Sequence, residues 1–213
     1  MANVEVMKMV DNMFCKNHTG KMETIFSIST LCDINPNCVA RMMNGNLICA
    51  KCFSHRMGQR MPGLVNKLKR NTEILTTTII DVDDIPVLMN DMLRGESFGD
   101  LNNEIQVVNY FNIFAKNAHA RCALWTKNPW IIASAMEKYS IKKPDNLVIV
   151  YSTPELNGEP NTEIFAKYPF VDKIFTVYDK THAKEINCGA RSCRTCGRCY
   201  SKDTERIINE MLK

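Results

Sequence analysis

Four cysteines near the end of the chain have a spacing typical of a metal cluster. Cys188, Cys193, Cys196 and Cys199 form the pattern C-x4-C-x2-C-x2-C. Closely spaced turns of this kind bring four thiolates to one compact [4Fe–4S] cluster. A structural zinc site also takes four thiolates, but usually from two C-x2-C pairs about a dozen or more residues apart. The spacing therefore favours an iron–sulfur cluster, with zinc as the alternative.

A second set of cysteines lies in the first part of the chain. It consists of Cys32, Cys38, Cys49 and Cys52, of which the last two form a C-x2-C pair. These longer spacings suit zinc and iron–sulfur equally well. If three thiolates held a cluster, one iron would stay open for an exogenous ligand, whereas Cys38 as a fourth ligand would close it. The set predicts a second metal site and leaves its metal open.

The composition is that of a globular protein in a reducing compartment. Of the 213 residues, 45% are apolar and 23% are charged, which is enough apolar material for a core. Ten cysteines in such a chain indicate metal binding rather than a disulfide framework. Glu5, Lys8 and Asp11 interrupt the first apolar stretch, and no apolar run is long enough to cross a bilayer. We expect a cytoplasmic protein with no membrane partner.

Positive charge is concentrated in two regions, although the formal net charge is only +4. Lys51–Arg70 contains basic residues and no acidic ones, and Arg191–Arg198 interleaves arginines with cysteines. Both regions could bind nucleic acid. No aromatic residues alternate with the basic ones, however, as a single-strand binder would require. A solvated helix face and arginines that offset thiolate charge are therefore the simpler interpretation.

Strands and helices are expected to alternate along the chain. Short apolar, β-branched runs predict strands at residues 25–29, 121–125, 147–151 and 174–177. Helical periodicity predicts helices from residue 61 to 75, 103 to 117 and 128 to 139, a short one from 83 to about 92, and a terminal one from 203. Asn128 and Pro129 are a suitable cap and first-turn pair. Residues 30–52 are expected to form a long ordered loop.

This alternation predicts the α/β class with a mainly parallel sheet. A closed eight-fold barrel typically needs ~250 residues. We therefore expect an incomplete (β/α) barrel of about five to six units, or an open doubly wound sheet. The prediction is a single domain over residues 1–213, with the partial barrel at 20–180 and a Cys-cluster extension with a terminal helix at 181–213. Either architecture binds ligands at the carboxyl ends of its strands, and the polar segments after the predicted strands should converge there.

Several short motifs follow one another in an order known from one family. They are FSISTLC at 26–32, ICAKCF at 48–53, SFGD at 97–100, LWTKNP at 124–129 and CGARSCRTCGRCY at 188–200. Over nearly the whole chain, these motifs resemble phage and prophage proteins of the "gene product 88" type. Those proteins are similar to radical-AdoMet enzymes in their presumed partial barrel and N-terminal cysteines. For a phage-encoded protein, the resemblance implies the cytoplasm of the host cell.

The resemblance implies an iron–sulfur enzyme that binds S-adenosyl-L-methionine (AdoMet). Cys32, Cys49 and Cys52 would hold a cluster with an open iron, and the C-terminal set would hold an auxiliary cluster. The cofactor pocket would be lined by Ser97, Asp100, Thr126 and Lys127. Asp100 would accept bonds from ribose hydroxyls or an ammonium group, and Lys127 would pair with a carboxylate or phosphate.

The chain departs from the radical-AdoMet pattern in one respect. Those enzymes usually hold their cluster with C-x3-C-x2-C, and no such run occurs in this sequence. The first gap would have to be enlarged, and coordination by Cys38 would remove the AdoMet site. The alternative is a non-enzymatic protein that binds zinc or an iron–sulfur cluster and engages nucleic acid or a host factor. The sequence does not predict a substrate.

Overall fold

The structure, a computed structural model, describes residues 3–182 and 185–212. A seven-stranded sheet runs through it in the order β1-β2-β3-β4-β5-β6-β7. The antiparallel pair is β1–β2, and each neighbouring pair from β2 to β7 is parallel. The strands are β1 Cys15–Lys16, β2 Phe26–Ile28, β3 Met92–Gly95, β4 Arg121–Thr126, β5 Leu147–Leu156, β6 Lys173–Tyr178 and β7 Ile207–Met211. The predicted α/β class and mainly parallel sheet are confirmed, and the sheet is open.

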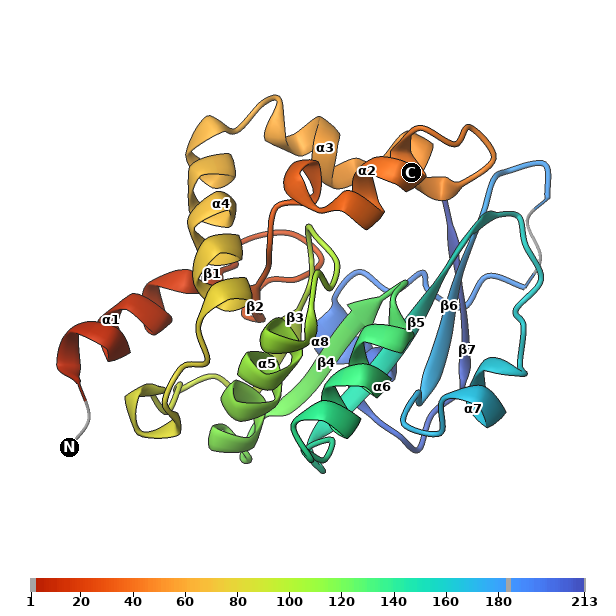
Figure 1. Cartoon of the computed structure of the whole chain (residues 1–213). Coiled ribbons are helices and arrows are strands. Elements are labelled where there is room, and N and C mark those ends of the chain that lie inside the picture. Colours follow the sequence, from red (N-terminus) through yellow and green to blue (C-terminus); the bar gives the residue numbers. More distant parts are fainter. Residues whose placement is uncertain (1–2, 183–184, 213) are drawn as a thin grey trace.

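The helices between β2 and β6 lie on one face of the sheet, whereas α8, in the connection from β6 to β7, lies on the other face. The strand order follows the sequence without reversal, so right-handed crossovers place successive helices on the same side. Figure 1 shows α4, α5 and α6 on this face and α8 behind the sheet. The α-helices are α1 Val4–Met13, α2 Pro36–Met42, α3 Phe53–Gly58, α4 Pro62–Thr77, α5 Glu104–Lys116, α6 Pro129–Lys138, α7 Ile164–Lys167 and α8 Cys193–Cys196. Short 3-10 helices occupy Cys32–Ile34, Ile48–Lys51, Val82–Asp84 and Arg198–Tyr200. The doubly wound alternative is wrong, because a doubly wound order reverses.

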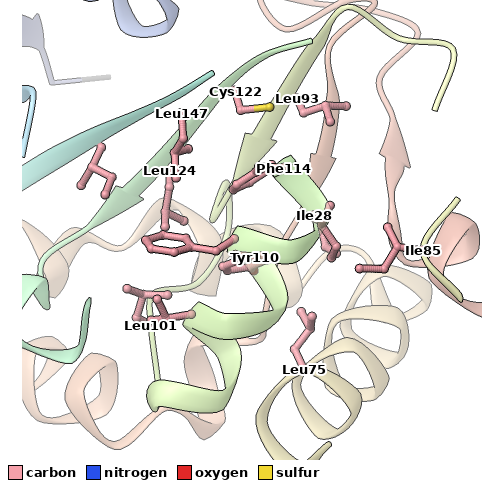
Figure 2. Packing of buried hydrophobic residues seen from close by; sticks show 14 of the residues in the cluster. Ile28, Leu75, Ile85, Leu93, Leu101, Tyr110, Phe114, Cys122, Leu124 and Leu147 are labelled. Carbon is pink, nitrogen blue, oxygen red and sulfur yellow. The ribbon is translucent and has the colours of Figure 1, made fainter. Parts of the chain in front are cut away.

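The helix-covered face of the sheet forms the main hydrophobic core. Helix α5 begins where the Asn103 side chain accepts a hydrogen bond from the Gln106 N–H, and its apolar positions then recur with helical spacing. Tyr110 and Phe114 of this helix stack on each other and pack near Leu93 and Leu124 of the strands (Figure 2). Burial of each such side chain stabilises the fold by about 1.5–3 kcal/mol.

The opposite face of the sheet is covered by the C-terminal cysteine region. Tyr200 packs there against Ile25, Met92 and Val148, and Trp125, Cys193 and Cys199 lie around this second cluster. Both faces of the central strands are therefore buried, as their nearly continuous apolar sequences require.

Two helix predictions are wrong. The terminal segment from Asp203 is strand β7, which pairs with β6 and buries Ile208 on the sheet. The segment from Asp83 to Met92 contains only a 3-10 turn at Val82–Asp84, followed by strand β3. Pro86 has no N–H to continue a helix. In the terminal segment, the hydrogen bonds of neighbouring strand β6 outweigh local helical periodicity.

We expect Leu124→Ala to lower the free energy of unfolding by about 2–5 kcal/mol, because it removes a side chain with no solvent exposure and leaves a cavity. Urea unfolding followed by circular dichroism measures this change. Met89→Ala is the matched control, since the Met89 side chain is 97% exposed and its loss should change stability little. Equal stability of the two variants would contradict the assigned packing of β4.

Candidate functional site

A cavity of roughly 750 Å³ opens at the carboxyl ends of the central strands. All four predicted cofactor-pocket residues, Ser97, Asp100, Thr126 and Lys127, line it. Its walls also include Cys32, Cys38, Cys49 and Cys52 of the first cysteine set and Cys188 and Cys199 of the second. Two groups of cysteines that are far apart in the sequence thus face one space.

The buried carboxylate of Asp100 holds the loops at this end of the sheet together. One of its oxygens accepts a hydrogen bond from the Thr126 hydroxyl at 2.6 Å, and the Lys127 N–H donates to it at 3.1–3.2 Å. Arg41 of α2 lies 3.4 Å from its second oxygen. Because these donors and the Leu101 N–H, at 2.8 Å, already surround this carboxylate, its first role is to orient the loops after β3 and β4.

Of five polar segments expected at the strand ends, four meet at this edge, namely residues 29–32, 97–100, 126–128 and 152–153. The Thr30 hydroxyl contacts the Asp100 carbonyl oxygen at 3.2 Å, and the Lys127 ammonium group donates to the Ser152 hydroxyl at 3.0 Å. The fifth segment, at 178–180, is bound elsewhere, since Asp179 accepts a hydrogen bond from Asn157. The Asn128 side chain does not cap α6 as expected, and instead donates to the Leu101 carbonyl at 2.8 Å.

Glu96 is a cavity residue that the sequence interpretation missed. Its side chain is 3% exposed, and its backbone has a positive φ of 54°. The carboxylate accepts hydrogen bonds from the Tyr110 hydroxyl at 2.5 Å, the Gln106 amide at 2.6 Å and the Thr30 hydroxyl at 3.0 Å. The sequence analysis predicted no strand at Met92–Gly95, and this omission hid the position of Glu96 at the end of a central strand.

Gly99 is required where the loop after β3 passes close to Thr30. A Cβ atom at this position would lie 2.5 Å from the Thr30 carbonyl oxygen and 2.7 Å from a carboxylate oxygen of Glu96. A larger residue would therefore displace the Thr30–Glu96 contact. This glycine is the signal in SFGD that could have indicated a tightly packed functional loop.

The Ser97 hydroxyl is a polar group that lacks a protein partner. Its oxygen is buried and has no hydrogen bond within the described residues, whereas its backbone N–H donates to the Ser29 hydroxyl at 2.8 Å. A buried hydroxyl without a partner is costly, so it is suited to bind a ligand in the cavity.

The first cysteine set lies on the helical turns between β2 and α4. Cys52 stands at the start of α3, where the backbone N–H groups of Ser54 and His55 favour its thiolate. Its thiol is hydrogen-bonded to that of Cys32, which lowers the pKa of Cys52 to about 5 and raises the pKa of Cys32. Burial raises the pKa of Cys49, while the positive charge of Lys127 opposes this shift. These thiols lie beside cations that favour thiolates.

The second cysteine set is arranged around α8. Gly197 ends this helix in the left-handed conformation at φ 63°, which turns the chain toward Cys199. The Lys21 ammonium group donates to the Cys188 sulfur at 3.3 Å. The pKa of Cys199 is raised to about 12, chiefly by burial; the charge of Arg94 opposes this shift, and the charges of the three other cysteines add to it.

Within residues 3–182 and 185–212, no three Cys, His, Asp or Glu side chains are placed so that they could hold a metal ion. The donor chemistry nevertheless suits a metal that prefers sulfur, because each set consists of thiols that influence one another's pKa and lie near lysine or arginine. The residues fit a thiolate-bound group in type and neighbourhood.

Arginines in the second basic region are bound to acidic residues of the same chain. Arg194 forms two hydrogen bonds with the Asp91 carboxylate at 2.7 and 2.9 Å, and Arg198 lies 3.3 Å from Glu205. In the first basic region, Lys67 donates to the Phe14 carbonyl at 2.6 Å, while Lys51 and Arg56 line the cavity.

Comparison of the chain with protein-family models, curated proteins and solved structures finds no match. Among the described residues, no helix combines the length and apolar character that a bilayer span needs.

The pH dependence of folding should reflect the buried Glu96. Burial raises the pKa of Glu96 from 4.5 to about 7. Since the folded protein then binds this proton more tightly than the unfolded chain, Glu96 favours folding fully below about pH 4.5, and this contribution is lost as the pH rises to about 7. The loss is on the order of 3 kcal/mol.

Urea unfolding of the wild type and Glu96→Gln at several pH values between about 4 and 8 tests this expectation. The variant should be less stable, because its amide faces donors, but its stability should fall less over this range. Glu73→Gln, on the exposed side of α4, should keep the wild-type slope. Parallel pH profiles for wild type and Glu96→Gln would contradict the assignment.

Proposed function

We propose that the protein is an iron–sulfur enzyme of the radical-AdoMet type whose substrate is unknown. The observation that supports this proposal most is the single cavity lined by both cysteine sets and by the polar ends of the strands. A sheet of sequentially ordered parallel strands with helices on one face is also compatible with an incomplete (β/α) barrel. The motif order that resembles the "gene product 88" type agrees with the same proposal.

Cys32, Cys49 and Cys52 would hold the cluster that faces the cavity. The charges of Asp100 and Lys127 at the strand ends act on the thiols of both Cys38 and Cys49. Cys32 and Cys52 are instead hydrogen-bonded to each other. On the resemblance, we assign the three ligand positions to Cys32, Cys49 and Cys52 and leave Cys38 as a neighbour, an arrangement that would keep one iron open.

When bound, such a cluster supplies an electron for reductive cleavage of AdoMet. The chain's own residues bind and orient the cofactor. The ammonium group of Lys127, whose protein partner is the Ser152 hydroxyl, would pair with a carboxylate, and the Ser97 hydroxyl would accept or donate one further hydrogen bond. Arg41 contacts Asp100 and also donates to the Asn128 side chain, which holds α2 and its Cys38 against the cavity.

The C-terminal segment would hold the auxiliary cluster. It would also exclude water from the face of the sheet opposite the connecting helices. Tyr200 is buried there, and its ring packs edge-on against Trp125 with 6.0 Å between centroids. Exclusion of water protects reactive intermediates from side reactions.

We expect anaerobically purified protein to contain about eight irons and eight sulfides, as two [4Fe–4S] clusters require. Cys49→Ala should lose half of both, and the core variant Cys122→Ala should lose neither, because Cys122 is buried within β4 and lies outside both sets. Iron, sulfide and zinc analysis with an absorption spectrum measures this. Two zincs without sulfide would exclude the radical-enzyme proposal. One zinc with about four irons would favour a metal-binding protein that engages nucleic acid or a host factor.

Reduced, reconstituted protein should convert AdoMet to 5′-deoxyadenosine, measured by liquid chromatography after addition of dithionite. Cys49→Ala should form none, because a cluster ligand is lost, whereas Cys38→Ala should retain product formation and its iron. If Cys38→Ala loses iron as Cys49→Ala does, Cys38 is a fourth ligand and the AdoMet site is not open. Absence of product from fully loaded wild type would refute the enzymatic activity.

A further inference from the structure

Arg94 is a cationic side chain on the face of the sheet that the C-terminal cysteine region covers. The proposed reaction does not use this side chain. It lies in β3, paired in register between Ser27 of β2 and Ala123 of β4. Its side chain lines the cavity and its guanidinium lies over the Trp125 ring, 3.9 Å from the centroid. This stacking fixes the plane of the guanidinium at the wall of the cavity.

No carboxylate neutralises Arg94 within the described residues. Its contacts are the Met22 sulfur, 3.3 Å from one terminal nitrogen, and the Trp125 ring, while its Nε is buried without a hydrogen-bond partner. Arg194 and Arg198, in contrast, lie within 2.7–3.3 Å of carboxylates. A partly buried cation without an anion is unfavourable, so an anion from outside the chain would gain much from binding here.

The nearest carboxylate in the sequence is turned away from this guanidinium. The positive φ of Glu96 directs its side chain to Tyr110 and Gln106 of α5, on the helix-covered side of the sheet. The backbone thus places the two charges apart, although only one residue separates them in the chain. Glu96 therefore does not pair with the guanidinium of Arg94 at the cavity wall.

The surroundings of Arg94 also indicate what the anion is attached to. Trp125, Phe175 and Val177 line the same cavity, so an apolar wall adjoins the guanidinium. A planar guanidinium with free N–H groups binds a carboxylate or phosphate through two parallel hydrogen bonds. We infer that Arg94 and Trp125 form a substrate subsite for a carboxylate or phosphate group joined to an aromatic or other apolar body.

The assignment of this anion to the substrate rests on the proposed function, but the binding itself does not require it. The Cys193 and Cys199 thiols are the acidic groups of the C-terminal set that Arg94 influences most directly. If a cluster there already neutralised Arg94, an added anion would find no site. A binding measurement therefore decides whether the charge of Arg94 binds an added anion or neutralises a cluster at the C-terminal cysteines.

Isothermal titration calorimetry on anaerobically purified protein, with the metals it carries, tests the subsite with three probes: benzoate, phenyl phosphate and the uncharged benzamide. Benzoate or phenyl phosphate should bind at least about tenfold more tightly than benzamide, because only the anions pair with the guanidinium. The tighter of the two anions identifies the group that the subsite prefers.

Arg94→Gln should weaken binding of the preferred anion at least about tenfold. Arg206→Gln is the matched control, because Arg206 also lies over an aromatic ring, 3.5 Å from the Phe165 centroid, but on the exposed surface outside the cavity. This control should bind as the wild type does. If Arg94→Gln does not fold, Arg94→Lys, which keeps the charge and loses the planar fork, should weaken binding about threefold or more.

Three results would overturn the subsite: no anion binding to the wild type, binding of neither anion more tightly than benzamide, or unchanged binding of the preferred anion in the folded Arg94 variants. Its failure is distinguishable from failure of the proposed function. Lost anion binding with normal iron and 5′-deoxyadenosine removes only the subsite. Anion binding that depends on Arg94 in a protein without iron or 5′-deoxyadenosine removes only the radical-enzyme proposal.

Discussion

The buried carboxylate of Asp100 joins segments that lie far apart in the sequence. It binds the Thr126 hydroxyl and the Lys127 N–H of the segment after β4, and it pairs with Arg41 of the first cysteine region. A buried charge is stable only when donors and cations surround it, so these contacts must form together. Through this carboxylate, the position of the N-terminal cysteines depends on the strand order of the sheet.

The C-terminal region contributes to the same cavity by a different route. Strand β7 pairs with the edge of β6. The segment before β7 passes behind the sheet, where Tyr200 packs in the cluster with Ile25, Met92 and Val148. The ammonium group of Lys173 donates to the Thr204 and Glu205 carbonyl oxygens, which secures this segment to β6. Cys188 and Cys199 thereby reach the same cavity that Cys32 and Cys52 line.

Charge in the cavity is distributed unevenly. Glu96 and Asp100 are bound by protein donors, whereas Arg94 has no carboxylate partner in the described part of the chain and the Lys127 ammonium group is bonded to a hydroxyl. Thiolates, an anionic cofactor group and an anionic substrate are the partners that such cations suit. The proposed cluster and the Arg94 subsite are two consequences of this imbalance.

The α/β class, four of the parallel strands and the two cysteine sets were predictable from the sequence alone, because apolar runs and close cysteine spacing are local signals. The sequence also placed Ser97, Asp100, Thr126 and Lys127 at the strand ends. It could not determine β3 or β7, whose short segments become strands only when β2, β4 and β6 offer hydrogen bonds. Because β3 was not predicted, the positions of Arg94 within this strand and of Glu96 at its end were not predicted either. Both residues line the cavity, but the fold directs the Glu96 carboxylate to α5 and the Arg94 guanidinium to Trp125, because the strand's alternation and one positive φ set those directions.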